Sequence, residues 1–221
     1  LPVWGEVANC FGSDARAKDN LIKEWSQIVR RDRNHPSIVA WVPINESWGT
    51  GDMSKVDNQH WLRSLYYWTK TMDPGRPVID NDGWEHVYCD IMAHHDYSKA
   101  EEYAERYPEK TPIDIVKFWT ELDKHRPTYA PGCVHRDVPV IITEWGGWGL
   151  YVDNPGQEPD HHKAWGYQGI LYKNFDEILD MYEAVIRELA KRKDYIWGHC
   201  YTEFCDYYQE VNGMLTFDRK P

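Results

Sequence analysis

Two glutamates each follow a predicted strand, and their pairing is the first pattern in the sequence that could do chemistry. Glu46 comes after the apolar run Ile38–Ile44 and is preceded by Asn45, and Glu144 comes after Val138–Thr143. Two carboxyl groups that face one cleft can cleave a glycosidic bond. One of them, held protonated, donates to the leaving oxygen, and the other attacks the anomeric carbon.

Polar and ionisable side chains also follow the other predicted strands. They are Glu6, Asp80-Asn81-Asp82, His94-His95-Asp96 and Glu203. In a β/α barrel, the carboxyl ends of the strands form the catalytic face. Any one of these residues is as well explained as a solvated loop charge, whereas the whole series favours a functional face.

The elements that must position these residues alternate between strands and helices. Short β-branched or aromatic runs predict strands at 2–6, 38–44, 77–80, 90–93, 138–143 and 195–201. Apolar spacing of 3.6 residues, with capping residues and prolines, predicts helices at 15–31, 55–72, 111–124 and 174–193. This order predicts an α/β fold with parallel strands and right-handed crossovers.

Composition narrows the class of partner. The chain of 221 residues has 25 Lys and Arg against 36 Asp and Glu, a net charge of −11. This balance argues against nucleic acid and against an anionic membrane, both of which need a basic face. The 12 Trp and 15 Tyr suit a carbohydrate cleft, and they also suit an ordinary core. No targeting segment is visible, so a periplasmic or extracellular and a cytoplasmic location both remain open.

The segments around the two glutamates resemble a known family. Asp32–Ser37, followed by Trp41 and then Asn45-Glu46, is similar to the acid/base signature of glycoside hydrolase family 2. This family contains β-galactosidases, β-glucuronidases and β-mannosidases. Ile142–Gly146 resembles the strand of the family that carries the nucleophile.

Two further segments extend the resemblance over nearly the whole chain, in family order. Asp90–Tyr97 resembles the strand that precedes the nucleophile, and Asn212–Pro221 resembles the segment after the last barrel strand. The resemblance implies a TIM (β/α)8 barrel, and it equates the six predicted strands with strands three to eight. Residues 1–221 are then an incomplete catalytic barrel, without its first two strands and without the family's upstream β-sandwich domains.

The resemblance also implies roles for individual residues. Glu46 is the general acid/base and Glu144 is the nucleophile of a retaining double displacement, for which carboxyl groups about 5–5.5 Å apart are expected. Asn45 contacts the sugar 2-hydroxyl, and Tyr97 hydrogen-bonds the nucleophile. Further candidates for substrate contact are His94, His95, Trp84, Trp145 and Glu6, and for each of these a packing role remains open.

Neither a metal nor another cofactor is expected. His94-His95-Asp96 and His161-His162 lack the spacing of a helical zinc site, and adjacent side chains on a strand point to opposite faces. The family's lactose-cleaving members carry a Glu-x-His magnesium pair in the loop after the strand that matches Val3–Glu6. The corresponding residues 7–12 contain no such pair.

The expected substrate is a neutral hexoside, with a β-galactoside favoured over a β-mannoside. The family's β-glucuronidases grip the uronate with an Asn-x-Lys pair, but here the stretch Glu210–Gly213 lacks the lysine and adds a negative charge. An inactive carbohydrate-binding barrel and a metal-dependent hydrolase remain as alternatives. The expected partners are a carbohydrate substrate, the remaining N-terminal part of the same polypeptide and, as a further option, a second copy of the chain.

Overall fold

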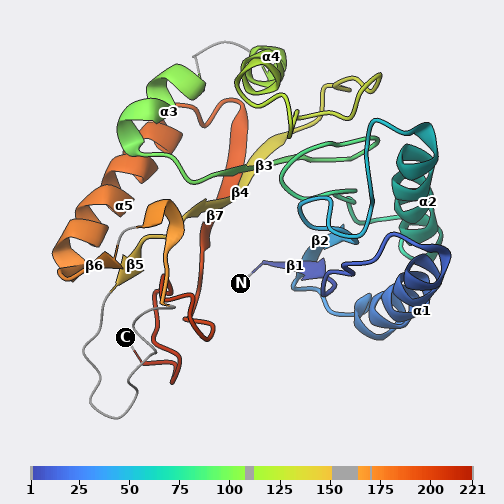
Figure 1. Ribbon diagram of the computed structural model, residues 1–221, viewed down its shortest axis with the longest axis horizontal. Helices are drawn as coiled ribbons and strands as arrows, with labels where there is room; N and C mark the ends of the chain where they lie inside the picture. The colour runs from blue at the N-terminus through green and yellow to red at the C-terminus, as the bar shows by residue number, and fades with distance from the viewer. Residues whose placement is uncertain (1, 108–111, 151–163, 170, 221) are drawn as a thin grey trace. The chain divides into compact units, whose positions relative to one another are not determined.

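The computed structural model (Figure 1) describes residues 2–107, 112–150, 164–169 and 171–220. Contacts divide the chain into two compact units. The first unit comprises residues 1–94 and 110–141, and the second comprises residues 95–109 and 142–221.

The first unit begins with two parallel strands, β1 (Val3–Glu6) and β2 (Ile38–Val42). The next segment continues this sheet only through isolated parallel bridges, from Trp41 to Val78 and from Asn45 to Asp82. The predicted strand at 77–80 is therefore not a continuous strand. On the side away from β2, the backbone N–H of Val78 donates to the Asp90 carboxylate at 3.0 Å.

Two amphipathic helices cover this sheet, α1 (Ala15–Asp32) and α2 (Val56–Met72), and they lie side by side (Figure 1). Both match the predicted ranges within one residue. Asp14 caps α1, because its carboxylate accepts from the backbone N–H of Ala17 at 2.8 Å.

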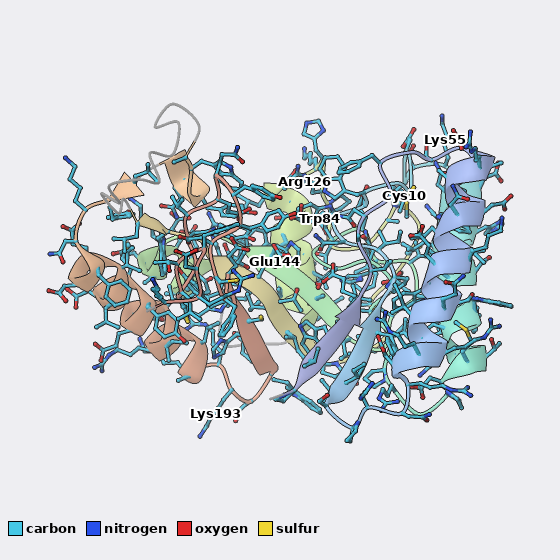
Figure 2. All side chains as sticks on the ribbon, turned by 90° about the horizontal axis from the view of Figure 1, so that it is seen from below. Cys10, Lys55, Trp84, Arg126, Glu144 and Lys193 are labelled. Atoms are coloured by element: carbon cyan, nitrogen blue, oxygen red, sulfur yellow. The ribbon has the colours of Figure 1, made fainter. Side chains whose placement is uncertain are left out.

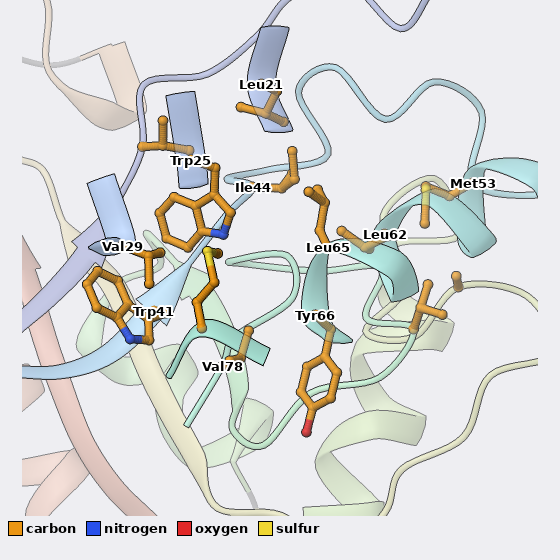
Figure 3. Close-up of a cluster of buried hydrophobic side chains, with 14 of the residues drawn as sticks. Leu21, Trp25, Val29, Trp41, Ile44, Met53, Leu62, Leu65, Tyr66 and Val78 are labelled. Atoms are coloured by element: carbon orange, nitrogen blue, oxygen red, sulfur yellow. The ribbon is translucent and has the colours of Figure 1, made fainter. Parts of the chain in front are cut away.

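The core of the first unit lies between the helices and β2 (Figure 3). Trp25 on α1 is completely buried, meets Trp41 on β2 edge to face at 5.7 Å, and donates its indole N–H to Thr69 on α2 at 2.7 Å. Leu62 and Leu65 of α2 are fully buried in the same cluster. This packing fixes β2, and with it the loop that carries Glu46.

Helix α4 (Pro112–Leu122) completes the first unit, close to the predicted 111–124. Thr111, the first residue of the predicted range, lies outside the described residues. Strands β3 (Met92–Asp96) and β4 (Val140–Gly146) each begin in the first unit and end in the second. The order of their three-stranded sheet is β3-β4-β7, with β7 at Ile196–Thr202.

Two helices pack together in the second unit, α3 (Ala100–Arg106) and α5 (Phe175–Ala190) (Figure 1). The short parallel pair β5 (Gly149–Leu150) and β6 (Leu171–Tyr172) lies there too, with the 3-10 turn η1 at Tyr167–Gly169. Asn174, where the predicted helix begins, caps α5: its side chain accepts from the backbone N–H of Asp176 at 2.9 Å.

Among the described residues, the structure has no helix that combines the length and the apolar character needed to cross a membrane.

Candidate active site

The loop after β2 presents Glu46 in an unusual backbone conformation. Glu46 and Ser47 have φ angles of 53° and 58°, in the left-handed region that non-glycine residues seldom adopt. The backbone N–H of Glu46 donates to the Asp82 carbonyl at 2.9 Å, and that of Trp48 donates to the Asn45 carbonyl at 3.0 Å. The neighbouring strand end and a tight turn therefore both hold this loop.

Asn45 lies immediately before Glu46 on the same loop. Its backbone N–H donates to the Asn9 side chain at 3.4 Å, and its side-chain oxygen is buried with no hydrogen-bond partner among the described residues. Buried acceptors normally have a donor. Asn45 therefore retains an unused hydrogen-bonding capacity next to the predicted acid/base.

Trp84 and Glu6 are the other two residues of the first unit that the sequence predicts to contact substrate. Trp84 is buried, and the guanidinium of Arg126 lies 4.5 Å from its ring centre. Both residues are labelled in Figure 2. One face of this indole is therefore covered by Arg126. Glu6 is exposed at the end of β1, where its register partner on β2 is Val42.

Glu144 lies on β4 in the second unit, with its side chain 24% exposed. The Tyr97 hydroxyl donates to its Oε2 atom, and His95 Nδ1 lies 3.3 Å from the same oxygen. Burial and the negative charge of Glu144 raise the pKa of Tyr97, so this phenol stays protonated and remains a donor. The structure thus brings two predicted site residues, Tyr97 and His95, to the carboxylate of a third, Glu144.

Tyr167, a residue that the sequence did not indicate, packs against the ring of Tyr97. The ring of Tyr167 stacks on Tyr97 with centres 3.6 Å apart and planes 2° apart, and Gln168 donates from its side-chain amide to the Tyr97 carbonyl at 2.5 Å. These contacts fix the ring that holds the nucleophile. No motif signalled Tyr167, because η1 lies far from Tyr97 in the sequence.

The two histidines of β3 point to opposite faces, as expected for neighbours on a strand. His95 faces Glu144, whereas the ring of His94 is buried against Trp119 of α4, with ring centres 4.1 Å apart. Of the two histidines predicted to contact substrate, His95 is therefore the one that lies beside Glu144. His94 is a packing residue in the structure.

Trp145 is likewise a core residue rather than a sugar-stacking wall. It is completely buried, and rings from α5, from β7 and from the loop between β4 and β5 surround it. These rings are Trp148, Tyr182, His199 and Tyr201. The same alternation that turns His94 away from His95 turns Trp145 away from Glu144.

Acidic side chains gather near the nucleophile in the second unit. Burial and repulsion by Glu210, Asp206 and Glu144 raise the pKa of Glu203 to about 7, and burial raises the pKa of Asp206 as well. The sequence offered Glu203 either as a substrate contact or as a solvated loop residue. Glu144 is one of the three acidic neighbours whose charge, after burial, contributes to this rise in the pKa of Glu203.

A second cluster has the atoms of a metal site but the hydrogen bonds of a structural one. Asp80, His86 and Cys89 are buried and bring their ligand atoms within 4.8 Å of one another. His86 Nδ1 bonds Asp80 Oδ1 at 2.8 Å, His86 Nε2 bonds the Ala93 carbonyl at 2.9 Å, and Asp80 Oδ2 accepts from the backbone of Val87 at 2.7 Å. These bonds engage both ring nitrogens of His86 and both carboxylate oxygens of Asp80. The predicted pair His161-His162 lies outside the described residues.

Comparison with known proteins decides the family. Residues 3–221 match the model of "Glycosyl hydrolases family 2, TIM barrel domain". The chain belongs to glycosyl hydrolase family 2. The predicted family and the predicted α/β barrel fold are thereby confirmed.

Individual relatives are distant and differ in the activities that their names give. The chain is 26% identical over 217 residues to the β-glucuronidase of Canis lupus familiaris, covering 88% of this chain and 28% of that protein. It is 29% identical over 125 residues to the β-galactosidase of Photobacterium profundum, covering 54% of this chain and 11% of that protein. The chain thus spans less than a third of the length of these relatives.

A solved structure of the family shares the fold. It is a family 2 β-galacturonidase from Eisenbergiella tayi bound to galacturonate, which is 16% identical with a TM-score of 0.64. The match covers all of this chain and 38% of the other. At this identity the likeness concerns the fold alone.

Proposed function

We propose that the protein is a retaining β-glycosidase in which Glu144 is the nucleophile and Glu46 is the general acid/base. The observation that carries this proposal is the setting of Glu144. Its carboxylate accepts a hydrogen bond from Tyr97 and lies 3.3 Å from a nitrogen of His95. A donor aimed at a carboxylate oxygen, here the Tyr97 hydroxyl, stabilises the ionised form and fixes its direction, which are the two properties that a nucleophile needs.

The proposed reaction has two displacements. Glu144 attacks the anomeric carbon while Glu46 donates its proton to the leaving glycosidic oxygen, which gives a glycosyl ester on Glu144 and a free aglycone. Glu46 then takes a proton from water, and the water oxygen attacks the anomeric carbon and releases Glu144. Asn45, with its unused hydrogen-bonding capacity, is the proposed contact for the sugar 2-hydroxyl.

The proposed substrate is a neutral hexoside, with a β-galactoside ahead of a β-mannoside. The support is the acidic group formed by Glu203, Asp206 and Glu210, whose charges already oppose one another. A uronate carboxylate would add a further negative charge beside Glu144. The second candidate is a β-glucuronide, and its support is the activity named for the mammalian relatives.

The test is a panel of aryl β-galactosides, β-mannosides and β-glucuronides, assayed with and without a chelator. Glu144→Gln should fold normally and lose turnover on every substrate. Full activity in that variant would remove Glu144 from the mechanism. Activity that the chelator abolishes would favour a metal-dependent hydrolase, and sugar binding without turnover in the unmodified protein would favour an inactive carbohydrate-binding barrel.

We also propose that the terminal strands of the described sheets pair with further strands of the same polypeptide. β7 ends the order β3-β4-β7, and its Trp197 is 70% exposed. Open strand edges with exposed aromatic side chains favour association. A second copy of the chain is the alternative partner, and light scattering of the full polypeptide distinguishes a monomer from a dimer.

A further inference from the structure

The acid/base loop adopts a backbone conformation that needs external support. Two consecutive residues without the freedom of glycine, Glu46 and Ser47, both have positive φ angles. Such conformations persist only where surrounding contacts hold them, and they occur at functional sites. The direction of the Glu46 side chain therefore depends on whatever fixes Ser47.

One buried side chain holds Ser47 at two points. Asn81 is completely buried, and its Oδ1 atom accepts from the backbone N–H of Ser47 at 2.8 Å. Its Nδ2 atom donates to the Ser47 hydroxyl at 2.9 Å and to the Trp84 carbonyl at 2.6 Å. The Asn81 amide thus joins the acid/base loop to the turn at residues 83–85.

Glu85 completes the network from that turn. The Ser47 hydroxyl accepts from Asn81 and donates to Glu85 Oε2 at 2.5 Å. Glu85 itself has a φ of 50°, so both loops joined by Ser47 hold a residue in the left-handed region. Burial raises the pKa of Glu85, and the hydrogen bond from Ser47 opposes that rise.

An asparagine suits this position for a specific chemical reason. The carbonyl of the side chain is needed as an acceptor for the Ser47 N–H, and the NH₂ group is needed as a donor to two oxygens. Aspartate supplies the acceptor but neither donor, and alanine supplies none of the three bonds.

We propose that Asn81 is a positioning residue for the general acid, acting through Ser47 and supported by Glu85. The inference rests on the proposed function, because it requires Glu46 to protonate the leaving group. When Asn81 is replaced, the loop loses the bonds that hold residues 46 and 47, and the Glu46 carboxyl no longer points steadily at the glycosidic oxygen. Proton donation weakens, while attack by Glu144 is unaffected.

Weakened proton donation is revealed by how strongly kcat/KM depends on the leaving group. An aglycone such as 2,4-dinitrophenol departs without a proton, whereas a poor leaving group such as methanol needs one. General acid catalysis contributes about 10²–10⁴-fold to rates. We therefore expect Asn81→Ala to lower kcat/KM for a methyl glycoside by about 100-fold and for the dinitrophenyl glycoside of the same sugar by less than about threefold.

Three companion variants make the test specific. Glu46→Ala should show the same dependence on the leaving group, in larger measure, and Ser47→Ala a smaller one. Gln59→Ala is the matched control in the first unit, because it also removes a buried amide that donates to two carbonyls, those of Met53 and Pro131. Gln59→Ala should affect both substrates equally, and circular dichroism and thermal melting check that each variant folds.

The outcomes are distinct. Selective loss on the methyl glycoside in Asn81→Ala, or in Ser47→Ala if Asn81→Ala does not fold, supports the inference. If Glu46→Ala is selective but Asn81→Ala loses activity equally on both substrates, or loses none, the inference is overturned. If Glu46→Ala itself shows no dependence on the leaving group, the proposed function fails instead, and the inference falls with it.

Discussion

Replacing Tyr97 by Phe removes one hydroxyl from the nucleophile and leaves the stacked ring in place. The hydroxyl donates to Glu144 Oε2, and the ring keeps its contact with Tyr167 at 3.6 Å. A hydrogen bond to a charged group contributes about 1.5–3 kcal/mol, which corresponds to a loss of about 10–150-fold in kcat/KM. His95 still faces the carboxylate, so activity should fall and not vanish.

The assay is steady-state hydrolysis of an aryl glycoside across a range of pH. With one donor fewer, the ionised carboxylate is less stabilised, so the acidic limb of the pH–rate profile should move to higher pH. Tyr103→Phe is the matched control in the same unit, because the Tyr103 hydroxyl donates at 2.9 Å to a backbone carbonyl, that of Asp96. It should lower stability by about 1 kcal/mol and leave the pH profile unchanged. An unchanged rate and unchanged acidic limb in Tyr97→Phe would refute the role assigned to this hydrogen bond.

Two further predictions concern stability. Trp25→Ala removes a fully buried indole and its bond to Thr69, so chemical denaturation should show a loss of about 3–5 kcal/mol, and a loss below about 1 kcal/mol would contradict the core described for the first unit. Because folding raises the pKa of Glu203 to about 7 from an ordinary 4.5, the folded state binds this proton more tightly than the unfolded chain. The resulting contribution is fully present below about pH 4.5 and is lost as the pH rises through about 7. Glu203→Gln should therefore flatten the fall in stability between pH 5 and pH 8, measured by denaturant unfolding, and an unchanged slope would refute the assigned pKa.

Sequence periodicity predicted the elements that form from local patterns. Helix α1 lies within one residue of its predicted range, because an apolar stripe and the capping residue Asp14 both act locally. The segment at 77–80 joins β2 only through an isolated bridge at Val78, whose backbone N–H donates to the side chain of Asp90, a contact that periodicity does not signal. Helix α3 was missed, although acidic Glu101 and Glu102 in its first turn and Arg106 in its last are a readable signal.

The site was predictable where a residue type and the strand period sufficed. Alternation along a strand already implies that His94 and His95 face opposite sides, and it equally implies that Trp145 turns away from Glu144. The roles of Asn81 and Tyr167 were not predictable in this way. Each role depends on a contact between segments that are distant in sequence. Asn81 bonds Ser47, which has a positive φ angle, and Tyr167 stacks on the ring of Tyr97.

The most direct test of the central claim is to trap the glycosyl-enzyme. The full polypeptide is incubated with a 2-deoxy-2-fluoro-β-galactoside that carries a good leaving group, and proteolytic peptides are mapped by mass spectrometry. The account predicts one fluorosugar, bound through an ester to Glu144. An adduct on Glu46, or turnover of an ordinary β-galactoside with inversion at the anomeric carbon and no adduct at all, would contradict it.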